Sequence, residues 1–277
     1  MNRKEKTIQE LNLEDDFLFA KVMSDPEICR QVLEQLLGIS IRQVILPESQ
    51  KTIDILYEGK GIRLDVYVND ENGTVYNVEM QRGRRRDLPK RARYYQGNLD
   101  LDQISAGEPY SALKRTYVIF ICTFDPFYEG RYRYTFENTC RENPSLALGD
   151  GTVKLFLNTR GDLEAAEEGV RDFLIYVEHT TNSFAAQARS PLIRLIHKKV
   201  LEVKASEEME VEFMTLAQRD RENIEIGREE GREEGRTLTF KIIELYGTGL
   251  SVDAIADKLE LKADFVAETI QAYERLR

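Results

Sequence analysis

The run TYVIFICTF, at positions 116 to 124, constrains the fold of this chain most strongly. It is almost wholly apolar, which is typical of a central strand covered on both faces. Such a strand needs neighbouring strands beside it and helices above and below it. We therefore expect an α/β fold built on a central sheet.

The rest of the first 160 residues supplies those layers. Residues 13–38 have a helical pattern that Pro26 divides after a Ser24-Asp25 cap, with Gly38 as a stop. Residues 87–107 predict another helix, with Pro89 in its first turn. Further strands are expected at 43–46, 52–57, 62–69, 75–81, 132–140 and 153–159. This order predicts a mixed sheet flanked by helices.

The segment GIRLDVYVNDENGTVYNVEMQ, at 61–81, reads as a hairpin with alternating apolar residues. A two-residue Asn72-Gly73 turn would place Asp65 opposite Met80 and mix the faces. A three-residue loop, with Gly73 in the left-handed conformation, places Asp65 opposite Glu79 and aligns the apolar faces. We therefore predict the three-residue loop, which also puts Arg63 opposite Gln81.

The predicted register brings two carboxylates together. Opposed residues have Cβ atoms about 4.5–5.5 Å apart, so like charges there destabilise the pair. A divalent cation such as Mg²⁺ or Mn²⁺ would offset the repulsion of Asp65 and Glu79. An exposed pair relieved by Arg63 or by solvent is equally compatible with this geometry.

The charge distribution adds a second feature. The chain has a net charge of -10, which argues weakly against nucleic acid as a partner. Between Arg82 and Arg93, however, seven basic residues accompany a single acid, Asp87. This cluster indicates either phosphate binding or a solvated start of the following helix.

Several classes of protein are disfavoured by the sequence. The N-terminus lacks an apolar signal region, and no apolar run is long enough to span a membrane, so we expect a cytoplasmic protein. Three scattered cysteines (Cys29, Cys122 and Cys140) and two histidines (His179 and His197) do not form a zinc motif. We interpret the cysteines as buried structural thiols and assign neither histidine a catalytic role.

The last third of the chain is helical and charged. We divide the chain into a domain at 1–205, a charged helical connector at 206–236 and a small helical segment at 237–277. GREEGREEGR, at 227–236, repeats every four residues and places its glycines near one helical face. We interpret it as a solvated connecting helix or hinge. The charged C-terminal helix also makes a homodimer through the C-terminal helices plausible, although it has no clean heptad repeat.

Residues 250–271 contain two short amphipathic segments, joined around Leu261-Lys262, that resemble a helix-turn-helix. Ser251 can cap the first segment, and Phe265, Val266 and Ile270 form the apolar side of the second. The segment has few basic residues for a DNA reader. DNA contact and a packing or oligomerising role therefore both remain open.

An Asp, followed one hairpin later by Glu-x-Gln and an arginine-rich helix start, resembles the PD-(D/E)XK nuclease core. Over nearly its whole length the chain is similar to the Rpn family of recombination-promoting nucleases and transposases. The matching pieces are DDFLFAKVM, RLDVYV, YNVEMQ, RARYYQGNLD, GEPYSALKRTYVIFI and the glycine-arginine-glutamate repeat. This resemblance implies a restriction-endonuclease-like mixed sheet flanked by helices, with a helical C-terminal extension.

The resemblance also implies a site. Asp65 and Glu79 match the metal-binding acids, and Gln81 completes the catalytic set where many relatives of the superfamily have lysine. A neutral amide can only orient by hydrogen bonds, so more of the electrostatic work falls on the metal, Mg²⁺ with Mn²⁺ as the alternative. Asp16 is the candidate for a further metal ligand, with Asp15 and Glu14 close beside it.

Arg84, Arg85, Arg86, Lys90 and Arg93 would neutralise DNA phosphates without reading sequence. The function expected from these residues is that of a metal-dependent DNA endonuclease of low sequence specificity, linked to recombination or mobile elements. The alternative is a catalytically degenerate module of the same fold that binds DNA or a protein partner. A third reading makes the C-terminal segment primary, as the DNA-binding part of a regulator.

Overall fold

The computed structural model describes residues 6–46, 52–53, 62–63, 65–84 and 86–275, and of 52, 53, 62 and 63 the backbone only. The chain divides into two compact units, Met1–Glu210 and Val211–Arg277. The first unit holds the sheet, and the second is wholly helical. The three-part division expected from the sequence remains a prediction.

The first unit contains a six-stranded mixed sheet in the order β1-β4-β5-β6-β8-β7. Strands β5, β6 and β8 are parallel to one another, whereas β1, β4 and β7 pair antiparallel with their neighbours. The strands are β1 (Val44–Ile45), β4 (Val66–Asp70), β5 (Val75–Gln81), β6 (Thr116–Cys122), β7 (Arg133–Phe136) and β8 (Thr152–Asn158), and a separate pair is formed by β2 (Thr52–Ile53) and β3 (Ile62–Arg63). Every residue of β6 is buried, which confirms the predicted central strand.

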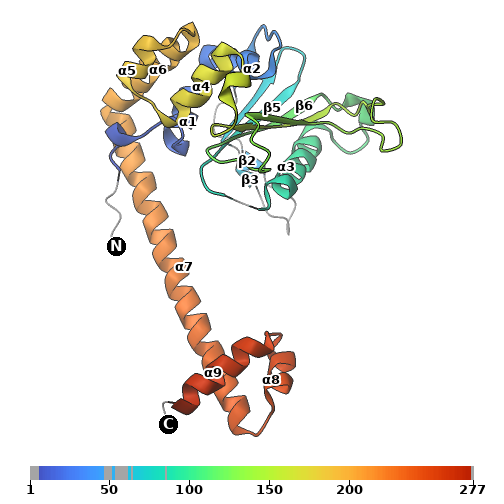
Figure 1. The fold of residues 1–277 in the computed structure, drawn as a ribbon, viewed down its shortest axis with the longest axis vertical. Coiled ribbons are helices and arrows are strands. Elements are labelled where there is room, and N and C mark those ends of the chain that lie inside the picture. The colour runs from blue at the N-terminus through green and yellow to red at the C-terminus, as the bar shows by residue number, and fades with distance from the viewer. Residues whose placement is uncertain (1–5, 47–51, 54–61, 64, 85, 276–277) are drawn as a thin grey trace. The chain divides into compact units, whose positions relative to one another are not determined.

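Helices cover both faces of this sheet (Figure 1). Helix α3 lies on one side, where Leu88, Ala92 and Leu99 pack with Val118 and Phe120 of β6. On the other side Figure 1 shows α2 and α4, with α1, α5 and α6 beyond them. The helices of this unit are α1 (Asp16–Met23), α2 (Pro26–Leu37), α3 (Leu88–Gln103), α4 (Glu168–Glu178), α5 (Asn182–Gln187) and α6 (Pro191–Ala205), with short 3₁₀ turns at Ile8–Glu10, Tyr110–Ala112 and Leu163–Ala165.

The residues predicted to begin and end the second helix do so in the structure, as the caps of α2. The Asp25 side chain accepts hydrogen bonds from the N–H groups of Glu27 and Ile28, and Pro26 occupies the first turn of α2. Gly38 ends α2 in the left-handed conformation, with φ of 66°. The expected division at Pro26 and the stop at Gly38 are therefore confirmed.

The β4–β5 hairpin has the predicted register, because Val66 pairs with Val78 and Asn69 with Val75. Gly73 has φ of 79°, as the three-residue loop requires. The predicted single strand at 62–69 is wrong, however, because it bends at Asp65 and Arg63 pairs with Thr52 rather than Gln81. Side-chain hydrogen bonds between Asp65 and β5 replace the backbone ladder at this bend.

The second unit has a small core of its own. It comprises most of α7 (Glu207–Gly247) together with α8 (Val252–Leu259) and α9 (Ala263–Arg275). Ile242, Ile255, Val266 and Ile270 are buried in it. Ser251 caps α8 as predicted, whereas Phe265 is 45% exposed and does not belong to the buried side of α9.

Two smaller expectations can be compared with the fold. Cys29 and Cys122 are buried free thiols, and Cys140 is half-buried. Across the described residues, none of the helices combines the length and apolar character needed to cross a membrane.

Candidate active site

The end of β5 brings the predicted acids together. The Asp65 N–H lies 3.3 Å from Glu79 Oε1, and the Met80 N–H donates to Asp65 Oδ2 over 3.0 Å. Glu79 is fully buried, Gln81 is 7% exposed and Asp65 is half-buried. The two carboxyl groups therefore lie side by side under α3, and the sequence-based alternative of an exposed pair relieved by solvent does not describe this geometry.

Arg91 of α3 is the counter-charge in this site. Its guanidinium donates to Glu79 Oε2 over 3.0 Å, to Gln81 Oε1 over 2.7 Å and to the Tyr95 hydroxyl over 2.7 Å. It also lies 5.0 Å from the centre of the Tyr95 ring. Arg91 therefore bridges the carboxylate of Glu79 and the amide of Gln81.

The environment of Glu79 disfavours its ionised form. Burial, and then the neighbouring Asp65 carboxylate, raise the pKa of Glu79 to about 8, although Arg91 opposes this shift. A buried acid pair of this kind gains from additional positive charge. The electrostatics of the site therefore favour binding of a cation.

Asn77 is a buried polar residue next to this pair. It lies two residues before Glu79 on β5, and neither its amide oxygen nor its amide nitrogen has a hydrogen bond of normal geometry within the described part of the chain. The amide nevertheless contributes to lowering the pKa of Glu79. A buried amide without a well-formed hydrogen bond is rare in proteins, and this one lies on the same face of the sheet as Glu79.

The donor set fits a hydrated divalent ion. Mg²⁺ typically uses one or two protein carboxylates and fills its remaining positions with water and substrate phosphate. Asp65 and Glu79 supply that number of carboxylates. Among the residues that the structure describes, no three Asp, Glu, His or Cys side chains are grouped closely enough to hold a metal.

Among the described residues, Asp16 does not form such a group with Asp65 and Glu79, although Arg91, which contacts Glu79, is close enough to lower the pKa of Asp16. Its side chain is exposed at the start of α1, where desolvation by the surrounding protein raises its pKa and Arg82 opposes the shift. The adjacent Asp15 is bound by Lys6 and by Arg82. Asp16 as a third metal ligand stays a prediction.

The predicted phosphate-binding residues lie at the surface beyond Gln81. Arg84 and Arg86 are exposed between β5 and α3, and Lys90 and Arg93 are exposed on α3. Arg85 lies outside the described residues. Of the two adjacent tyrosines on α3, Tyr95 is 6% exposed and Tyr94 is 38% exposed.

Sequence reasoning counted Arg91 in the basic cluster but gave it no role. Leu88, Ala92, Tyr95 and Leu99 recur at helical spacing on the buried side of α3. Arg91 lies next to that stripe, one turn before Tyr95, while Lys90 and Arg93 point to solvent. The helical period could therefore have separated Arg91 from the other arginines.

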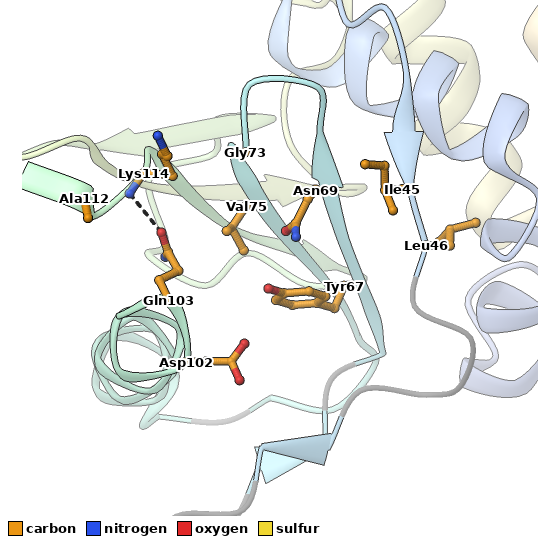
Figure 2. Close-up of a pocket in the computed structure, with 10 residues that line it drawn as sticks. All are labelled: Ile45, Leu46, Tyr67, Asn69, Gly73, Val75, Asp102, Gln103, Ala112 and Lys114. Carbon is orange, nitrogen blue, oxygen red and sulfur yellow. Dashed lines mark hydrogen bonds between the residues drawn. The ribbon is translucent and has the colours of Figure 1, made fainter. Parts of the chain in front are cut away.

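A cavity of about 460 Å³ lies elsewhere on the α3 side of the sheet. Figure 2 shows Tyr67, Asn69 and Val75 lining it from the hairpin, and Asp102 and Gln103 from the end of α3. The Lys114 N–H donates to Gln103 Oε1 over 2.9 Å at its border. Neither Asp65 nor Glu79 lines this cavity, so we do not place the active site in it.

Comparison with known proteins agrees with this geometry. A family model described as PD-(D/E)XK nuclease family transposase matches residues 13–142. Neither the curated proteins nor the solved structures gave a match. The matched region contains the acid pair, Gln81 and the basic cluster, and the sheet with its flanking helices fits the nuclease fold. Residues 13–142 therefore form a PD-(D/E)XK nuclease family transposase domain, from a family that includes the Rpn proteins.

Proposed function

We propose that this domain is a metal-dependent DNA endonuclease of low sequence specificity that acts in recombination or on mobile elements. The observation that carries the proposal is the contact of half-buried Asp65 with fully buried Glu79, where ionisation of Glu79 beside Asp65 is disfavoured without a further cation. Mg²⁺ is the expected ion, with Mn²⁺ as the alternative.

The residues of the chain have separate tasks in this proposal. Asp65 and Glu79 hold the cation, and Gln81 orients a substrate or water oxygen through its amide. A bound divalent cation supplies positive charge to a phosphoryl oxygen and favours ionisation of water near neutral pH. Arg91 donates to Glu79 Oε2 in this structure, so Arg91 and a bound cation would share the Glu79 carboxylate.

Low sequence specificity follows from the kind of contact that the basic cluster can make. Contacts to phosphates fix the position of a protein on DNA but do not read bases. We assign such contacts to the exposed residues beyond Gln81, namely Arg84, Arg86, Lys90 and Arg93, together with Arg85. Binding should therefore weaken steeply as salt concentration rises.

Nicking of supercoiled plasmid by the full chain tests the proposal. We expect nicking with Mg²⁺ or Mn²⁺ and none with EDTA. Asp65→Asn and Glu79→Gln should each lower the rate by about 100-fold or more, because metal stabilisation of several kcal/mol corresponds to at least two factors of ten. Glu164→Gln, at an exposed acid remote from β5 in sequence, is the control and should cleave normally.

A second candidate function is supported by Arg91 and Gln81. Arg91 already donates to Glu79, and the amide of Gln81 replaces a cationic side chain, which is the arrangement expected of a degenerate nuclease fold that binds without cutting. Salt-sensitive DNA binding without nicking in either metal would establish this function. It would also refute the proposed endonuclease.

We also propose that the chain forms a homodimer through its C-terminal helices. In α7 the face of Gly227, Gly231 and Gly235 is flanked by Arg228, Arg232 and Arg236 on one side and by Glu230 and Glu234 on the other. Residues four apart along each flank carry like charges and repel one another, although Glu229 and Glu233, three residues before Arg232 and Arg236, offset part of that repulsion. In a parallel pair the arginine flank of one helix meets the glutamate flank of the other, which relieves that repulsion.

A further inference from the structure

The loop after β6 holds an exposed aromatic residue in an unusual backbone conformation. Tyr128 has φ of 62° and is 72% exposed. A bulky side chain rarely adopts the left-handed region, and such outliers cluster at functional sites. Packing of the Tyr128 ring does not account for this conformation, because most of the side chain faces solvent.

The surrounding loop enforces the conformation of Tyr128. Asp125 accepts hydrogen bonds from the N–H groups of Phe127 at 3.0 Å, Tyr128 at 2.9 Å and Gly130 at 2.7 Å, and from the Tyr134 hydroxyl at 2.8 Å. These bonds outweigh the effect of burial and lower the pKa of Asp125. The Asp125 carboxylate therefore stabilises the conformation of this loop by hydrogen bonds to its backbone.

Phe127 provides the second anchor of this loop. Its ring lies 4.9 Å from that of Tyr134 and 5.0 Å from those of Phe136 and Phe156, centre to centre. Because Phe127 points into the core, its neighbour Tyr128 is held outward. The backbone that carries the exposed Tyr128 ring is therefore anchored by the bonds of Asp125 and by the packing of Phe127.

The loop lies beside the segment that follows the candidate active site. The Thr123 N–H donates to the Gln81 carbonyl over 3.1 Å, and the Thr123 hydroxyl donates to the Arg82 carbonyl over 3.2 Å. Farther along both segments, the Arg84 guanidinium lies 5.7 Å from the centre of the Tyr128 ring. The Tyr128 ring and the Arg84 guanidinium therefore lie together beyond the C-terminal end of β5.

We propose that Tyr128 stacks on an unpaired nucleobase of the DNA substrate while Arg84 contacts a phosphate next to that base. Stacking on an aromatic side chain tolerates any base, and it requires a base that is not already stacked within a duplex. The pair therefore selects single-stranded or locally opened DNA without selecting a sequence. This inference rests on the proposed function, because it assumes a DNA substrate.

Binding measured in EDTA tests the inference apart from cleavage. The full chain is titrated against a labelled duplex that carries one unpaired 2-aminopurine and against the fully paired duplex. We expect tighter binding to the first and a changed 2-aminopurine fluorescence. Tyr128→Ala should lose about tenfold in affinity for the first duplex only, and Tyr128→Phe should keep it.

Two further variants exclude trivial causes. Tyr110→Ala removes another exposed tyrosine, which is 84% exposed, and should bind like the natural chain. Tyr128→Gly removes the ring but accepts the left-handed backbone, so its loss of preference cannot be attributed to misfolding. Equal affinities of the natural chain and Tyr128→Ala for the unpaired duplex would overturn the inference alone. Failure of the natural chain to bind either duplex would overturn the DNA-directed function as well.

Discussion

At the residue scale, the Glu79 carboxyl group has a different pKa in the folded chain than in the unfolded chain. Burial and Asp65 raise its pKa to about 8 in the folded chain, from an ordinary value of 4.5. Between these two values the folded chain holds a proton that the unfolded chain has lost. The stability that comes from neutral Glu79 is therefore complete below the ordinary pKa and is lost as the pH rises through about 8.

Replacing Glu79 by glutamine tests this pH dependence, because an amide cannot ionise. In EDTA the melting temperature of the natural chain, relative to that of Glu79→Gln, should fall as the pH rises from about 5 to about 8. Mg²⁺ should raise the melting temperature of the natural chain more at the upper end of that range, since the ionised acid binds the cation. Parallel melting curves for the two proteins across the range would contradict the prediction.

Some residues of the site could be predicted from the sequence and others could not. The pairing of Asp65 with Glu79 follows from strand alternation and loop length, both of which are local properties. The reach of Arg91 to Glu79 and Gln81 depends instead on how α3 docks on the sheet. The elevated pKa of Glu79 depends on its complete burial in the folded unit as well as on Asp65, and that burial is not a local property of the sequence.

At the element scale, the turn after β8 depends on a close backbone approach. A Cβ atom at Gly161 would lie 2.4 Å from the carbonyl carbon and oxygen of Arg131 and 2.5 Å from the Tyr132 nitrogen. The clash is with backbone, so a side-chain rotation cannot relieve it. We expect Gly161→Ala to lower the free energy of unfolding by about 2 kcal/mol or more in urea titrations.

Gly97→Ala is the matched control for this substitution. Gly97 lies inside α3, and a Cβ there would have no atom within 4 Å. Alanine should raise the free energy of unfolding by about 0.5–1 kcal/mol, because glycine is the weaker helix former. A Gly161→Ala protein as stable as the natural chain would mean that Arg131 and Gly161 are not in close contact.

The elements show where local sequence signals suffice. The caps of α2, the buried strand β6 and the hairpin loop at Gly73 were predicted, because each depends on a few adjacent residues. The bend at Asp65 was not, because side-chain hydrogen bonds to β5 replace the strand pairing that the alternating pattern indicates. The exposure of Phe265 was missed for a similar reason, since the way α9 packs decides which side of its apolar stripe is covered.

At the scale of the whole molecule, the proposed homodimer depends on the glycine-arginine-glutamate repeat of α7. Every residue of the glycine-arginine-glutamate repeat, at 227–236 in α7, is exposed. A Cβ atom at Gly227, Gly231 or Gly235 would have no other atom within 4 Å. The glycines are therefore not required by the packing of a single chain. Each one weakens a lone helix by about 1 kcal/mol relative to alanine, so their regular spacing favours close approach of another helix.

Replacing all three glycines by alanine separates helix stability from pairing. The variant should keep or gain helical content by circular dichroism, yet three added methyl groups hold the partner helix away, so we expect dimer affinity to fall at least tenfold by analytical ultracentrifugation. Glu229→Ala with Glu233→Ala, on the opposite side of α7, is the control and should dimerise normally. In a parallel pair, exchanging Arg228, Arg232 and Arg236 for glutamate should abolish self-association, because glutamate flanks would then face each other. A monomeric natural chain, or undiminished pairing of the alanine variant, would refute the glycine face as the contact.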